Sequence, residues 1–186
     1  MKSLGESSSS TMIISQPNAR QLARLPLRAI VAYASRAAHR VMISCTVEYA
    51  ETCENALRIA NDFVRLSSVG SDVARRAACA AAAVAGVEAS DEAGRDLRVG
   101  LAVRAAAECC YYSVIAASSA NVDPTSCLQK VANQAVRAAR QMDEIDDGLA
   151  IADYEALVKI FGNQESVVLG EPFDPSDDGP LGDAQK

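Results

Sequence analysis

The sequence predicts an all-α protein, an alanine-rich bundle of about six helices, mostly antiparallel, with disordered termini. Hydrophobic residues make up 49% of the 186 residues, but aromatic residues only 4%, and Trp is absent. The core must therefore consist mainly of Ala, Val, Leu and Ile, which suits closely packed helices. Ala, Leu and Arg are also among the strongest helix formers. No stretch alternates apolar and polar positions between turns, as a half-buried strand would.

The chain divides into three parts. Residues 1–16 are Ser-rich and are expected to form a disordered N-terminal tail. Residues 17–162 carry the helical patterns and are expected to form one bundle. Residues 163–186 are acidic and rich in Asp, Gly and Pro, so we expect a disordered tail there.

Two helices are expected before residue 70. Pro17 and Asn18 open a short helical stretch, and Pro26 restarts it, because proline is well tolerated only in a first turn. From there apolar residues recur with helical period up to Val41. A second helix, 47–66, shows the strict 3,4 spacing of near-parallel helix packing at Ala50, Cys53, Leu57, Ala60 and Val64.

The next two helices are expected in the middle of the bundle. The first, 71–87, begins behind an N-cap at Ser71 or Asp72 and carries no charge from Ala77 to Val87. A helix that is apolar on all sides is normally buried on all sides. The other, capped by Ser90, has two apolar stripes, which also indicates a central position.

The last two helices have clear boundary signals. Asp123 and Pro124 form an N-cap and first-turn pair. Gly148 separates that helix from a short final helix, whose expected end is marked by Gly162. The inward positions are expected to be Leu128, Val131, Ala135, Ala139 and Met142, then Ile151, Tyr154, Val158 and Phe161.

The six cysteines indicate buried thiols in a reducing compartment, and we expect a cytoplasmic protein. None of them forms a CxxC pair, and one histidine cannot complete a zinc site of ordinary spacing. No metal or cofactor is therefore expected. The alternative is redox sensing by Cys109 and Cys110, although a disulfide between helical neighbours is strained. The stretch Val99–Val122 is long enough to cross a bilayer, but Arg104 and Glu108 interrupt it, so no membrane contact is expected.

Charge is distributed unevenly along the chain. Residues 1–142 hold 16 Lys/Arg and 12 Asp/Glu, whereas residues 143–186 hold 2 and 12. An arginine row, spaced by four with one gap, consists of Arg20, Arg24, Arg28, Arg36 and Arg40.

The arginine row is a candidate binding surface for an anion or an acidic protein, because guanidinium groups match carboxylates and phosphates. Pro26 interrupts the row, so the residues expected to lie together on one continuous helix are Arg28, Arg36, His39 and Arg40. The alternatives are an ordinary solvated helix face, or an acidic tail that folds back on the row. Nucleic acid is not expected as a ligand, because the whole chain is acidic and lacks a known nucleic-acid-binding motif.

No catalytic constellation is present, so we expect a protein that is not an enzyme. His39 is the only histidine, and its nearest possible nucleophile in sequence is Cys45. A second candidate site is a polar pocket at Arg104, Glu108 and Tyr112. The first two of these are i,i+4 neighbours in an otherwise apolar helix.

The segment from Arg28 to Val41 resembles the opening of Imm-5-like immunity proteins and related alanine-rich bacterial proteins of unknown function. Departures are Met42-Ile43-Ser44 in place of Pro-Leu-Phe, and no histidine from Val99 to Ala120. The matching positions are Arg28, Ala29, Tyr33, Ala34, Ala37, Arg40 and Val41. The resemblance implies a small helical protein that neutralises a toxin by binding it.

Two functions are therefore expected as alternatives. The first is protein–protein binding without catalysis, through the arginine row. The second is a regulatory bundle that binds a small molecule or an anion. An alanine-rich surface left exposed on the third or fourth helix would also permit a homodimer.

Overall fold

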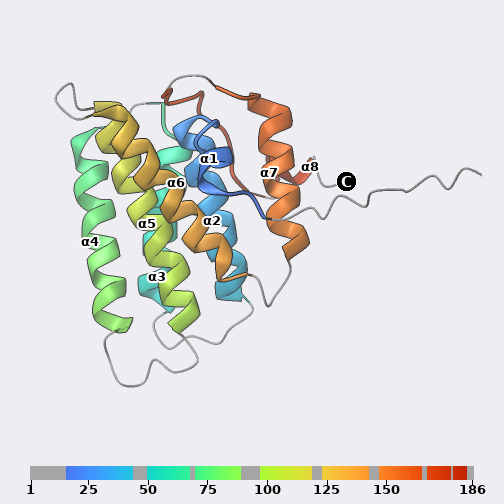
Figure 1. The fold of residues 1–186 in the computed structure, drawn as a ribbon. Helices are drawn as coiled ribbons and strands as arrows, with labels where there is room; N and C mark the ends of the chain where they lie inside the picture. Colours follow the sequence, from blue (N-terminus) through green and yellow to red (C-terminus); the bar gives the residue numbers. More distant parts are fainter. Residues whose placement is uncertain are drawn as a thin grey trace, which may run out of the picture.

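The protein is an all-α bundle, as the sequence predicts. The computed structural model describes residues 16–43, 50–67, 70–88, 97–118, 123–142, 147–164, 167–176 and 178–183, and these ranges contain no strand. Within these ranges the fold consists of six long helices and two single helical turns, and Figure 1 shows how they are arranged. They are α1 (Ala19–Leu22), α2 (Leu27–Ile43), α3 (Ala50–Arg65), α4 (Ser71–Glu88), α5 (Leu97–Ser118), α6 (Pro124–Arg140), α7 (Asp147–Phe161) and α8 (Pro180–Asp183).

Local sequence signals set most helix ends. Asn18 and Gln21 form a capping box at the start of α1. The carboxylate of Asp123 accepts hydrogen bonds from the first backbone N–H groups of α6, as its N-cap role predicts. Gly162 follows α7 with φ of 67°, a left-handed conformation that glycine adopts without strain. The prediction for Gly148 is wrong, because α7 begins one residue before it. The Ser-rich tail, Cys45 and the Ser90 cap lie outside the described residues.

Helix α5 occupies the centre of the bundle, where it packs against α2, α3, α4 and α6. It is long and apolar enough to cross a membrane, and it is the one such helix in the described ranges. Within the bundle, however, 61% of its most apolar window is buried. A core helix meets the same criteria of length and composition.

Helix α4 lies at an edge of the bundle, against α5 and α3, which corrects the prediction that it is central (Figure 1). Its side chains Cys79, Ala82 and Ala83 are exposed, as is Gly86. An alanine methyl gains only about 0.8 kcal/mol on burial, so an alanine-rich helix is tolerated with one side in water.

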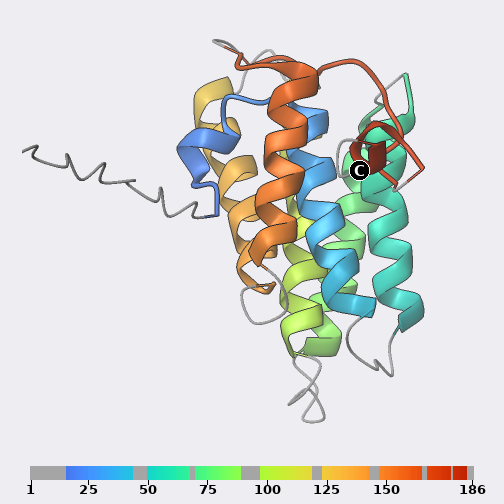
Figure 2. The ribbon, with the colours of Figure 1, turned by 90° about the vertical axis from the view of Figure 1, so that its right-hand side faces the viewer.

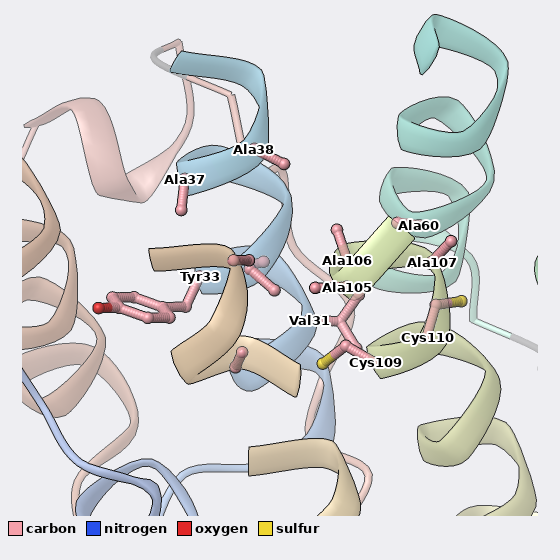
Figure 3. Close-up of a cluster of buried hydrophobic side chains, with 14 of the residues drawn as sticks. Val31, Tyr33, Ala37, Ala38, Ala60, Ala105, Ala106, Ala107, Cys109 and Cys110 are labelled. Atoms are coloured by element: carbon pink, nitrogen blue, oxygen red, sulfur yellow. The ribbon is translucent and has the colours of Figure 1, made fainter. Parts of the chain in front are cut away.

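Small side chains fill the core where the helices approach closely. Figure 3 shows Ala105, Ala106 and Ala107 of α5 beside Val31 of α2 and Ala60 of α3. All five of these residues are at most 1% exposed. The largest fully buried side chains are Tyr33 on α2 and Phe63 on α3. Close helix packing therefore replaces the aromatic core that the composition excludes.

Residues 167–176, which we call the C-terminal strap, run as extended chain from the end of α7 across α2 to α3 (Figure 2). The strap carbonyls of Val168 and Leu169 accept hydrogen bonds from the N–H groups of Leu27 and Arg28, at 2.9 and 3.1 Å. The first N–H groups of a helix have no partner within the helix, so the strap supplies acceptors to α2. This order corrects the prediction of a disordered tail for the described part of residues 163–186.

Candidate functional site

Arg28, predicted to bind a partner, is buried and holds three backbone carbonyls. It is 2% exposed. Its guanidinium donates hydrogen bonds to the oxygens of Phe63 at 3.3 Å, Leu66 at 2.5 Å and Gly170 at 2.5 Å. The first two carbonyls belong to the end of α3, where helix carbonyls lack partners. Burial lowers the pKa of Arg28, against the opposing effect of the charge on Glu171. Arg28 is thus a link between α2, α3 and the strap, and it is not available to a ligand.

Arg36 and Arg40 share one buried carboxylate, that of Asp153 on α7. Arg36 Nε lies 3.0 Å from Asp153 Oδ1, and Arg40 Nη1 lies 2.5 Å from Asp153 Oδ2. Asp153 is 1% exposed, Arg36 7% and Arg40 17%. Arg36 Nη1 also donates a hydrogen bond to the carbonyl oxygen of Pro175, near the end of the strap, at 2.9 Å. This clamp joins α2 to α7 and to the strap.

The predicted residues Arg36, His39 and Arg40 also line a single hollow of about 350 Å³, which we call the α2 pocket. Its wall on α3 is Asn61, whose Oδ1 accepts a hydrogen bond from Ser35 at 2.6 Å. Three of its nine lining residues are basic and one is acidic. Those nine are Ser35, Arg36, His39, Arg40, Ile43, Asn61, Pro175, Ser176 and Asp178. The arrangement offers hydrogen-bond donors of the kind that carboxylates and phosphates accept.

The second predicted site, Arg104, Glu108 and Tyr112, lines another hollow of about 290 Å³, between α5 and α4. Arg104 Nε donates to Glu108 Oε1 at 2.9 Å, and Arg137 Nη1 lies 3.8 Å from Glu108 Oε2. The floor on α4 consists of alanines, and Tyr111 adds a second phenol ring. Glu108 is thus paired with Arg104 inside the hollow and with Arg137 of α6, which does not line it, so the carboxylate already has its ionic partners.

Sequence reasoning missed Asp153, which organises the first site. The predicted inward positions of α7 are only half-buried, whereas Ala150, Asp153 and Leu157 are buried. The buried face of α7 is therefore rotated by about one residue, or roughly 100°, from the face that the sequence predicted to point inward. No signal within α7 indicates this, because the partners of the carboxylate lie more than a hundred residues away.

Cys109 and Cys110 lack the exposed, readily ionised thiols that a redox sensor requires. Both are buried on α5. Burial raises the pKa of Cys109, and it raises that of Cys110 to about 12. Because the thiolate is the reactive form, thiols with raised pKa values and no access to solvent react slowly. Among the described cysteines, Cys79 on α4 is exposed.

The contact between Asp174 and Arg65 should make strap attachment sensitive to acid. A hydrogen bond from the Ser176 backbone and another from Arg65 lower the pKa of Asp174 from 3.8 to about 2. Because the folded-state pKa is depressed, the contribution to stability is complete above about pH 4 and is lost as the pH falls towards 2. We expect Asp174→Asn to reduce the dependence of the urea midpoint on pH between 5 and 2, relative to wild type. An unchanged pH dependence in the variant would show that the contact contributes nothing.

The fold and the α2 pocket define this chain as a helical bundle with a polar hollow that its own strap closes on one side. Comparisons with protein-family models, with curated proteins and with solved structures returned no match.

Proposed function

We propose that the protein acts by binding rather than by catalysis, and that the α2 pocket takes a small ligand bearing a carboxylate or phosphate group. The observation that carries this proposal is the convergence of Arg36, His39 and Arg40 on one hollow with Ser35 and Asn61. Guanidinium and imidazole groups beside the amide of Asn61 suit an anionic group that needs several donors, and the Ser35 hydroxyl orients that amide through its own hydrogen bond.

The pocket also has the size and the support of a ligand site. Its volume of about 350 Å³ is at the lower end of the range for small-molecule sites. The clamp on Asp153 holds the two arginine side chains in place, so little ordering is required when a ligand enters. His39 is exposed at the rim and takes no part in the clamp. It is therefore the residue through which binding can be altered without loosening the fold.

The test is calorimetric titration with inorganic phosphate and with citrate, at matched ionic strength. We expect His39→Glu to weaken binding by at least about tenfold, because it places a carboxylate beside the incoming anion. The control is Gln129→Glu on the exposed side of α6, which adds the same charge at a residue that does not line the pocket. Absence of binding to wild type, or equal binding by the two variants, would exclude an anion site here.

Protein–protein binding remains the second candidate, and one observation favours it. Ile43 lines the α2 pocket and is 70% exposed, and an apolar side chain beside a polar hollow is common in protein interfaces. Neutralisation of a toxin, which the resemblance to Imm-5-like proteins implies, would use such a contact. Ile43→Ala should weaken capture of a protein partner and leave phosphate and citrate binding intact, because it removes apolar surface from the rim without adding a charge to the pocket.

A further inference from the structure

The outward face of α4 differs from the outward faces of its neighbours because it carries no charge over about three turns. No charged residue lies between Arg76 and Glu88. The exposed residues in this interval are Cys79, Ala82, Ala83 and Gly86. By contrast, the exposed side of the neighbouring helix α3 carries Glu51, Glu54, Arg58 and Arg65. Uncharged small side chains allow another helix to approach closely, since interaxial distance depends on the side chains at the contact.

Hollows flank α4 on both sides, so the helix stands out as a ridge. On the α5 side lies the hollow of about 290 Å³ beside Arg104 and Glu108. On the α3 side a hollow of about 520 Å³ is lined by Ala83 together with Glu51, Thr52, Glu54, Asn55 and Arg58. A partner that packs on the ridge can therefore place long side chains in the hollows beside it.

Charges around the ridge are separated along its length. Arg76 Nη2 lies 3.6 Å from Asp62 Oδ2 near the start of α4, whereas Glu51 and Glu54 flank its second half. Arg75 lies on the ridge near its first turn and is 74% exposed. Neither Glu51 nor Glu54 has an ion pair within the part of the chain that the structure describes. The ridge thus has Arg75, in contact with Asp72, at one end, and at the other two acidic residues that form no ion pair among the described residues.

We propose that this face binds a second copy of the chain, with α4 antiparallel to α4 of the partner. The two-fold axis lies in the interface, perpendicular to α4 and close to Ala82. It places Arg75 of each copy over Glu51 and Glu54 of the partner subunit, so the face is complementary to itself. The contact of Arg75 with Asp72, at 2.6 Å, is a surface pair that is readily exchanged. A parallel arrangement would instead bring the two Arg75 side chains together, which like charge disfavours.

The first test is light scattering coupled to size-exclusion chromatography of the full chain. We expect wild type to elute as a dimer at about 100 μM, and Ala82→Glu to elute as a monomer, because the two introduced carboxylates would meet at the axis. Ala82 is exposed, so this variant should keep the circular dichroism spectrum and melting temperature of wild type. Gln129→Glu on α6 is the control of equal charge and should remain dimeric. A monomeric wild type, or a dimer that Ala82→Glu leaves intact, overturns the proposal.

The second test addresses the antiparallel arrangement. Arg75→Glu alone and Glu51→Arg/Glu54→Arg alone should each be monomeric, because each brings like charges together across the axis. A mixture of these two variants should form a heterodimer, since both ends of the ridge then face opposite charge. Failure of the mixture to associate overturns this arrangement. Capture of a different protein by a monomeric chain, in a manner lost in Ala82→Glu, would assign the face to that partner and also overturn the proposal.

Discussion

Replacing Asp153 by alanine is expected to lower the free energy of unfolding by about 3–5 kcal/mol, because it leaves two arginines without their shared buried carboxylate. Arg36 is 7% exposed and Arg40 is 17% exposed, so water compensates little for the first and partly for the second. The free energy of unfolding should be measured by urea titration at neutral pH. If the dependence of this free energy on urea concentration has the same slope in both proteins, the difference between them is a difference in stability.

Asp62→Ala is the matched control for this prediction. Asp62 also lies between two arginines, with Arg58 at 3.7 Å and Arg76 at 3.6 Å, but it is 33% exposed. Exposed ion pairs contribute at most about 1 kcal/mol, so this variant should lose far less than Asp153→Ala. Adding Arg36→Met and Arg40→Met to Asp153→Ala should restore part of the stability, because it removes the unpaired charges. Equal losses for the two single variants would show that the clamp is not a buried ion cluster.

Replacing Arg28 by methionine is expected to destabilise the protein by about 3–5 kcal/mol, because it leaves three backbone carbonyls without donors. Methionine keeps an unbranched apolar stem, so the loss reports mainly on the hydrogen bonds to Phe63, Leu66 and Gly170. The strap should also detach from α2. Limited proteolysis should then cut it in the variant under conditions in which wild type resists.

Two further variants separate the geometry of Arg28 from its charge. Arg28→Lys keeps the charge but cannot donate to three carbonyls from one planar group, so we expect a loss only slightly smaller than that of Arg28→Met. Arg65→Met breaks the exposed contact between Arg65 and Asp174, at 2.7 Å, and should cost less than about 1 kcal/mol. A lysine variant as stable as wild type would show that charge alone explains the role of Arg28.

The strap also depends on Gly170, which the sequence does not single out. Gly170 has φ of 83°, and a Cβ atom built there would lie 2.6 Å from the Cβ atom of Pro26. Only glycine combines this left-handed conformation with so close an approach to α2. The high Gly, Pro and Asp content of residues 163–186 led to a prediction of disorder. In the described part of this segment, an extended chain instead packs against the start of α2 and the end of α3.

Local chemistry explains why most helices could be predicted. The N-cap at Asp123, the restart at Pro26 and the left-handed Gly162 act within one turn of a helix, where sequence spacing equals spatial spacing. Most of the buried positions of α3 and α6 followed from the same periodicity, whereas Ala50 and Leu128 are only half-buried. The error on α4 has a physical reason: the run Ala77–Val87 has no polar face to point outwards, so periodicity could not tell an edge helix from a central one.

By itself, the sequence determined that the chain forms helices, where most of them begin and end, and which polar residues stand out in them. Only the tertiary structure decided that Arg28 and Arg36 are interior links, that Asp153 on α7 is the shared ionic partner of Arg36 and Arg40, and that Arg36, His39 and Arg40 line one pocket. The reason is that these contacts join residues far apart in the chain. Their energies depend on burial and distance, and neither is encoded in the local pattern that specifies a helix.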